Sequence, residues 1–295
     1  MTALSADAIE RPPRTMSERL TRMVSKGPIH IGLALVALIW LLPTFGLLIT
    51  SFRPASELST GWWEIFGGRL NFTLDNYAEV LGSQGMLQAF INSVSISIPA
   101  TILPVLVAAL AAFGFAWVDF PFRDTIFLII VGLLLVPLQM TLIPLVEIFR
   151  DLGMFSSFIG LWVAHTTFAL PFGIFLLRNF FITLPRDLIE AARIDGASSW
   201  NIFRTVVLPL SVPALASFAI FQFLWVWNDL LMALVFAPRP GGLPMTTQVN
   251  GLLGTFGTEW HLLAAASFLI MVVPLIVFFS LQRYFVQGLL AGSVK

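Results

Sequence analysis

Each of six apolar segments in this chain is long enough to cross a lipid bilayer, and no other feature restricts the fold as strongly. A helix rises about 1.5 Å per residue, so about 20 residues cross the roughly 30 Å of hydrocarbon in a bilayer. Charged residues make up 11% of the chain, against roughly 25% in a soluble protein, so the chain lacks the charge for a water-exposed surface. The sequence therefore predicts an all-α membrane protein with six transmembrane helices, at residues 28–50, 88–117, 125–149, 156–180, 211–236 and 262–283.

Two features inside these segments predict how the helices are shaped and packed. In the second segment, Ala108, Ala112 and Ala116 repeat at a spacing of four, and small residues in such a row let two helices approach closely. Spanning helices tolerate proline where neighbouring groups satisfy the freed carbonyls, so we expect kinked helices. The internal prolines are Pro43, Pro99, Pro104, Pro137, Pro144, Pro171 and Pro274.

The basic residues are distributed unevenly between the two sides of the predicted bundle. With the N-terminus in the cytoplasm, every Lys and Arg except Arg53, Arg69, Arg150 and Arg239 falls on the inner side or at an inner helix end. The excess of Lys and Arg in cytoplasmic segments then predicts that both termini are cytoplasmic. The chain divides into a cytoplasmic segment at 1–27, a six-helix transmembrane domain at 28–283 with a long inner loop at 181–210, and a cytoplasmic tail at 284–295.

The residue types that the chain lacks exclude several classes of function. It has no cysteine, which excludes disulfides, a cysteine nucleophile and thiolate metal sites. His30, His165 and His261 are far apart and form no HExxH motif, so we do not expect a zinc enzyme. Neither Lys26 nor Lys295 lies in a GxxxxGK[ST] phosphate loop, so any ATP would be hydrolysed by another subunit. Because acidic and basic residues balance at 16 each, we expect no basic face for nucleic acid.

The inner loop at 181–210 carries the start and stop signals of two short helices. Pro185 suits a first helical turn, because its missing N–H would be unpaired there. Gly196 adopts positive φ freely and predicts a helix stop. Ser198 or Ser199 can cap a second helix, which we expect Pro209 to end. The pattern predicts a helix–turn–helix held against the inner face of the membrane.

The two predicted short helices have different apolar faces. Trp200, Phe203 and Val207 follow i, i+3, i+7 spacing and are expected to share one face of the second helix. Ala191 and Ala192 are expected on one side of the first helix, where small side chains leave a low-profile surface that can seat in a groove of another protein.

The motif of this loop resembles the EAA signature of permease subunits of binding-protein-dependent ABC importers. It reads Glu190-Ala191-Ala192, then Asp195-Gly196-Ala197, then Val206-x-Leu208-Pro209, between the fourth and fifth segments. The resemblance covers most of the chain and weakens in the first 70 residues. Trp227-Asn228-Asp229 and the C-terminal sequence from Gln282 are similar to the carbohydrate class and to the smaller permeases of maltose-type systems. Ser51-Phe52-Arg53-Pro54 and Gly61-Trp62-Trp63 are similar to permeases for α-glucosides.

The resemblance implies a type I ABC importer permease fold in a bacterial or archaeal plasma membrane, and it implies the partners. These are a second homologous permease, two ATPase subunits, an extracytoplasmic sugar-binding protein and the lipid bilayer. ATP and Mg²⁺ would be bound by the ATPases, so we expect no cofactor on this chain and no catalytic activity of its own. The residues 185–196 would form a coupling helix seated in an ATPase cleft, and the tail from Gly288 would run along the ATPases. The coupling residues carried over are Glu190, Ala191, Ala192, Arg193, Asp195, Gly196 and Ala197.

Polar residues inside the apolar segments are candidates for the substrate pathway, since polar groups in a membrane are rarely without function. Sugars are bound by hydrogen bonds and by stacking on aromatic faces. The alternatives are that these side chains snorkel to the interface or contact the partner permease; Glu147, by contrast, is expected at the outer interface. The candidates are Gln88, Asn92, Gln139, His165, Trp225, Trp227, Asn228 and Asp229.

Other readings of the same sequence are open to test. An ion-coupled secondary transporter would also be a helical bundle, but it usually carries buried acidic residues at mid-membrane, whereas the acidic residues here cluster in loops and at segment ends. An intramembrane enzyme would need a catalytic constellation that is not evident. Trp62 and Trp63, in the outer loop, are interpreted as interfacial anchors, with contact to an external partner as the alternative.

Overall fold

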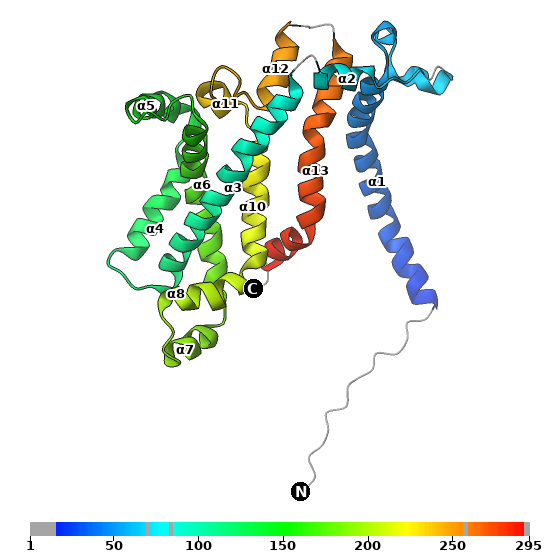
Figure 1. Cartoon of the computed structure of the whole chain (residues 1–295). Helices are drawn as coiled ribbons and strands as arrows, with labels where there is room; N and C mark the ends of the chain where they lie inside the picture. The colour runs from blue at the N-terminus through cyan, green and yellow to red at the C-terminus, as the bar shows by residue number, and fades with distance from the viewer. Residues whose placement is uncertain (1–15, 69–70, 83–84, 256–258, 292–295) are drawn as a thin grey trace.

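The computed structural model describes residues 16–68, 71–82, 85–255 and 259–291, and this part of the chain contains helices but no strands. Four helices are long and apolar enough to cross a membrane, and two bent pairs of helices raise the number to six if each pair is one span. The all-α prediction is confirmed. The four long helices, shown in Figure 1, are α1 (Met16–Phe52), α3 (Met86–Trp117), α6 (Phe158–Phe181) and α13 (Trp260–Ala291). The predicted tail is therefore helical as far as Ala291, and residues 292–295 lie outside the described part.

The third predicted span is not one helix, which corrects the expectation of a continuous segment at 125–149. It consists of α4 (Arg123–Gly132), a 3-10 turn (Leu133–Leu135) and α5 (Leu138–Asp151), and the two halves meet at 103°. Val136 is extended at ψ 115°, as expected for a residue that precedes proline, and Pro137 has no N–H to continue the helix. The span therefore breaks at Pro137.

The fifth predicted span is also broken, because α10 (Val212–Trp227) ends well before residue 236. Asn228 terminates α10, and the Asp229 carboxylate accepts hydrogen bonds from the amides of Met232 (3.4 Å) and Ala233 (3.0 Å), at the start of α11 (Leu231–Phe236). A side chain that satisfies free amides at a helix start favours a new helix over continuation of the old one. The 16 residues of α10 cover about 24 Å, less than a full bilayer.

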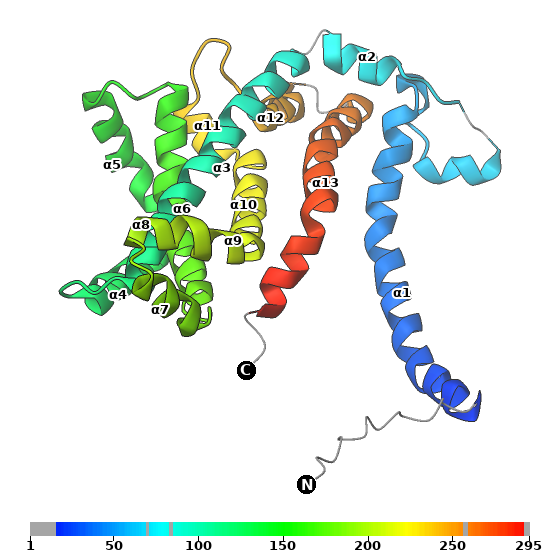
Figure 2. The ribbon, with the colours of Figure 1, turned by 60° about the horizontal axis from the view of Figure 1, so that its bottom comes forward.

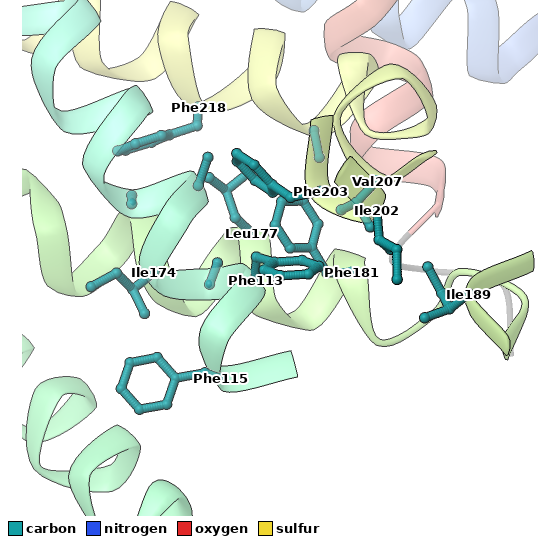
Figure 3. Packing of buried hydrophobic residues seen from close by; sticks show 14 of the residues in the cluster. Phe113, Phe115, Ile174, Leu177, Phe181, Ile189, Ile202, Phe203, Val207 and Phe218 are labelled. Atoms are coloured by element: carbon teal, nitrogen blue, oxygen red, sulfur yellow. The ribbon is translucent and has the colours of Figure 1, made fainter. Parts of the chain in front are cut away.

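The core of the bundle lies where α3 packs on α6 and α10 (Figure 3). Ala108 and Ala112 of α3 are fully buried, which confirms the prediction that this row of small residues lies at a close helix contact. On α6, a methyl group added at Gly173 would overlap the ring of Phe218 and come within 3.0 Å of the Ala108 Cβ. Small residues on both α3 and α6 therefore set how closely these helices approach.

α1 stands away from this core and packs mainly along α13, so most of its apolar surface is exposed in the isolated chain (Figures 1 and 2). Its upper end leads into two 3-10 turns (Ala55–Glu57 and Trp62–Gly67) and α2 (Asp75–Gly82). Arg53 folds this connection by donating to the Glu57 carbonyl (2.8 Å) and the Thr60 hydroxyl (2.7 Å). The Trp62 ring packs edge-on against Phe45 at 6.0 Å. Whether Trp62 and Trp63 meet lipid or a partner remains a prediction.

Candidate functional site

The first short helix of the long loop, α7 (Arg186–Ile194), lies at one end of the bundle, opposite α2 and α12 (Met245–Thr255) (Figure 1). It begins directly after Pro185 and ends in a Schellman motif around Gly196, whose φ is 79°. The Gly196 amide donates to the Arg193 carbonyl at 3.0 Å, and the Ala197 amide donates to the Ala192 carbonyl at 2.9 Å. The predicted start and stop of this helix are confirmed.

The second half of the loop is less regular than the sequence predicts. Ser198 caps α8 (Ser199–Ile202) by accepting a hydrogen bond from the Asn201 amide at 3.3 Å, which confirms one of the two predicted caps. A π-helical turn (Phe203–Val207) and α9 (Leu208–Leu210) follow, and the chain bends by 76° into α10. The continuous helical stretch Ser199–Leu210 ends one residue after Pro209, as predicted.

The loop is held on the bundle by a buried apolar seat. Ile189 of α7 is 1% exposed and packs in the same cluster as Ile202, Phe203 and Val207 (Figure 3). The Trp200 ring contacts that of Phe203 at 5.6 Å, as expected for a shared face, but Trp200 lies at the edge of this face and is 58% exposed. Burying an isoleucine side chain such as that of Ile189 stabilises the packing of the loop on the bundle by about 1.5–3 kcal/mol.

The two alanines of the EAA motif do not share one outward face. Ala192 and Ala197 are half-buried against the apolar seat, whereas Ala191 is exposed, which corrects the expected paired surface. The reason is that Ala192 lies three residues after Ile189 and so falls on the same side of the helix. The outward face of α7 consists of Leu188, Glu190, Ala191 and Ile194, and Ile194 is 86% exposed.

Arg193 points away from the outward face. Its Nη2 donates to the carbonyl oxygen of Trp117, the last residue of α3, at 2.8 Å. A cation at the end of a helix is favoured by the helix dipole and satisfies one of the unpaired terminal carbonyls. Arg193 therefore ties α7 to α3, a contact that the sequence did not indicate. Asp195, the last residue before Gly196, is exposed.

At the other end of the bundle, the structure brings together three of the predicted pathway residues. His165 on α6 is buried, its Nε2 lies 3.9 Å from Asp229 Oδ2, and its ring packs perpendicular to Trp225 at 5.6 Å. Ser93 of α3, His165 and Asp229 line a cavity of about 10 Å³, roughly the space of one water molecule. His165 Nδ1 is buried without a hydrogen-bond partner in the described part of the chain.

Trp225 also faces a much larger cavity of about 440 Å³. The broken span, α6 and α10 line this cavity, which is open at the surface of the isolated chain. Its walls are apolar except for the hydroxyl groups of Thr141 and Thr167 and the indole N–H of Trp225. Sequence reasoning missed the lining residues Thr141, Thr167 and Phe168, because an apolar wall has no chemical signature and this cavity depends on the 103° bend. Gln139 is exposed near that bend, and Asn228 is exposed with its amide donating to the Leu224 carbonyl at 2.7 Å.

Two of the other predicted pathway residues, Asn92 and Trp227, are buried and bonded to backbone carbonyls, whereas Gln88 is exposed. Asn92 is buried and donates to the carbonyls of Gly241 (2.7 Å) and Leu243 (3.0 Å), and Gln88 donates to Asn92 at 3.1 Å. Trp227 is buried and donates to the Ile270 carbonyl of α13 at 3.0 Å. Asn92 and Trp227 are thus engaged by backbone carbonyls, although Trp227 also lines the small cavity with His165 and Asp229, whereas Trp225 lines the large one.

A broken helical bundle with an open cavity between its helices and an exposed, firmly seated helix at one end has the architecture of a membrane permease. The chain belongs to the family described as binding-protein-dependent transport system inner membrane component, whose profile matches residues 30–290.

Similar proteins extend this assignment. The osmoprotective compounds uptake permease protein GgtD of Synechocystis sp. is 52% identical over 294 residues, which is 98% of this chain and 99% of that protein. The alpha-glucoside transport system permease protein AglG of Rhizobium meliloti is 54% identical over 230 residues, or 76% of this chain and 60% of that one. A chain of a bacterial ABC transporter involved in the import of alginate has the same fold, with a TM-score of 0.74 at 21% identity, covering 93% of this chain and 100% of that chain.

Proposed function

We propose that this chain is a permease subunit of an ATP-driven sugar importer and forms half of the translocation pathway together with a second, homologous permease. The observation that carries the proposal is the outward face of α7, which is exposed while its opposite face is fixed by Ile189 and the Schellman turn. The names of the relatives support the transport class, and AglG supports an α-glucoside as the substrate. GgtD supports an osmoprotective compound as the alternative substrate.

In this proposal α7 is the coupling helix that seats in a groove of an ATPase subunit. Ala191 allows close approach, Ile194 fills an apolar part of the groove, and Glu190 makes polar contacts there. ATP and Mg²⁺ are bound by two such ATPase subunits. Because the ATPase pair binds α7 differently in its open and closed states, ATP binding shifts the permease pair between inward-facing and outward-facing conformations.

The substrate would pass along the cavity beside Trp225. An indole presents a flat apolar face on which a sugar ring can stack, the hydroxyl groups of Thr141 and Thr167 line the same cavity, and His165 packs against the Trp225 ring. An extracytoplasmic binding protein would deliver the sugar at the end of the bundle that carries α2, α11 and α12. The solved alginate transporter in complex with a pentasaccharide-bound periplasmic protein supports this arrangement.

The proposed location is the plasma membrane of a bacterium or archaeon, with both termini and α7 in the cytoplasm. The family description as an inner membrane component supports the membrane assignment, and the concentration of Lys and Arg on the α7 side supports the orientation.

Uptake by the complete complex in proteoliposomes tests the proposal. We expect uptake of an α-glucoside or an osmoprotective compound only with ATP and the binding protein, and no uptake driven by a proton or sodium gradient alone. Glu190→Arg should abolish uptake and release the ATPase subunits without reducing membrane insertion, whereas Glu190→Gln should retain most of the uptake. Gradient-driven uptake without ATP would instead support a secondary transporter.

A further inference from the structure

The inner half of the broken span is attached to the bundle by few contacts. α4 contains no fully buried residue, and its main packing contact is the Phe127 ring, which meets Phe115 at 5.6 Å and Phe175 at 6.5 Å. Arg178 of α6 lies over the same ring at 4.2 Å from its centre. A helix held by so little buried surface can change position at low cost in free energy.

Four charged side chains also connect α4 to its neighbours through pairwise contacts. Arg123 Nη1, at the start of α4, lies 2.9 Å from Asp119, and Arg123 Nε lies 3.5 Å from Asp124. Asp124 in turn lies 3.9 Å from Arg178 Nη2. Because the two carboxylates are exposed, these pairs add little stability, but they connect the start of α4 both to the preceding turn and to α6.

The turn between α3 and α4 contains a strained residue. Phe122 has φ 61°, in the left-handed region that side-chain-bearing residues seldom adopt, and its own side chain is exposed. Strain of this kind persists only where surrounding contacts impose it, and it marks positions at which a chain can change its path. Arg123 closes the turn through Asp119 and through the Val118 carbonyl at 3.5 Å.

Arg193 brings the coupling helix to this turn. Its bond to the Trp117 carbonyl joins α7 to the last residue of α3, directly before Val118. Figures 1 and 2 both place α4 at the same end of the molecule as α7 and α8. The contacts thus run from α7 through Arg193 to the α3–α4 turn, and from that turn through Arg123 and Asp124 to Arg178.

We propose that Arg193 is a positioning residue that makes α4 move together with α7, through the turn at 118–122 that links the end of α3 to α4. In this arrangement, a displacement of α7 by an ATPase moves the inner half of the broken span, and Leu133 and Leu134, which follow α4, line the 440 Å³ cavity. In this proposal Arg193 transmits the movement of α7 to the α3–α4 turn inside the permease, and it does not contact the ATPase. The inference rests on the proposed coupling function of α7.

The first test compares uptake with ATP hydrolysis in the complete reconstituted complex. Arg193→Gln should leave the ATPase subunits bound and hydrolysing ATP, but should lower the number of sugars transported per ATP by about fivefold or more, the range of ordinary coupling between sites. Arg193→Lys, which keeps a donor, should restore part of the ratio. Arg204→Gln removes a charge from an exposed position of the same loop and should keep the wild-type ratio.

The second test measures the movement directly. The chain has no cysteine, so spin labels can be attached to it specifically at introduced cysteines. In the complete complex, the distance between labels at Leu128→Cys in α4 and Ser199→Cys in α8 should stay constant between the nucleotide-free and ATP-bound states. The distance between Leu128→Cys and Met140→Cys in α5 should change. Arg193→Gln should make the first distance change between the two states.

The outcomes separate this inference from the proposed function. If the wild-type complex fails to bind ATPase subunits or to transport, the proposed function is wrong. If the wild-type complex transports and Arg193→Gln keeps both the wild-type ratio and the constant α4–α8 distance, the coupling function stands and the role of Arg193 is overturned.

Discussion

The amide nitrogen of Ala197 lies 2.9 Å from the carbonyl oxygen of Ala192, so the chain reverses direction within five residues around Gly196. This bond and the cap at Ser198 place α7 and α8 at a fixed angle, although both are short. Isolated helices of this length are unstable in water, so their order depends on these caps and on the apolar seat below them.

Gly196→Ala should disorder this turn. No atom lies within 4 Å of the added methyl group, so the penalty arises only from the φ of 79° and amounts to about 1–2 kcal/mol. We expect lower uptake at unchanged membrane levels, measured in cells and by quantitative blotting. The control is Gly114→Ala in the interior of α3, which also has free space around the methyl group but no positive φ, and which should not reduce uptake. Equal uptake by the two variants would contradict the role of the turn.

Ile189→Ala should destabilise the seat of the coupling helix by about 2–5 kcal/mol, because it leaves a cavity in the buried cluster. The thermal midpoint of the purified complex in detergent measures this loss. Ile194→Ala, on the exposed face of the same helix, should change the midpoint little but weaken ATPase binding, read from co-purification. A lower midpoint for Ile194→Ala than for Ile189→Ala would reverse the assignment of the two faces.

Trp225 and Trp227 should respond differently to substitution, despite their proximity in sequence. Trp227→Ala removes a buried ring and its bond to the Ile270 carbonyl and should cost about 3–5 kcal/mol of stability. Trp225→Ala, at a ring that is 37% exposed, should cost less stability and instead reduce uptake. Uptake kinetics and thermal unfolding on both variants separate these effects. Normal transport by a stable Trp225→Ala variant would remove this residue from the pathway.

Gly173→Val should prevent the close packing of α6 on α3 and α10. Its side chain would overlap the Phe218 ring and press on Ala108, and overpacking of a tight core costs about 1–3 kcal/mol or more. We expect less folded protein in the membrane, measured by fluorescence-detected size exclusion. The double variant Gly173→Val with Phe218→Ala should recover part of the loss, and no recovery would mean that the two residues do not clash.

The helix–turn–helix could be read from the sequence because its signals are local. Gly196 supplies a positive φ and Ser198 supplies a cap acceptor wherever they are placed in a chain, so both were predictable from residue type. The orientation of Arg193 was not predictable, because its partner Trp117 is 76 residues away and offers only a backbone oxygen.

The helix breaks show why the rest of the fold could not be predicted in the same way. Pro99, Pro104 and Pro171 lie inside continuous helices, whereas Pro137 lies at a 103° bend. Whether a proline bends or breaks a spanning helix depends on what satisfies the freed carbonyls, and those groups come from neighbouring helices. The roles of the predicted pathway residues also depend on neighbouring helices. Asn92 and Trp227 have the chemistry of a sugar site, but they donate hydrogen bonds to the carbonyls of Leu243 and Ile270.

The sequence by itself determined that the chain is helical and apolar, where its long segments lie, and that its inner loop forms a capped helix–turn–helix of the permease family. These properties follow from hydropathy, helix length and the backbone preferences of single residues, which act over a few neighbours. The tertiary structure alone decided which spans break, which polar side chains face the cavity beside Trp225, and which face of α7 remains exposed. Those outcomes depend on contacts between residues far apart in the chain, since a buried polar group takes whichever partner the packed helices bring within reach.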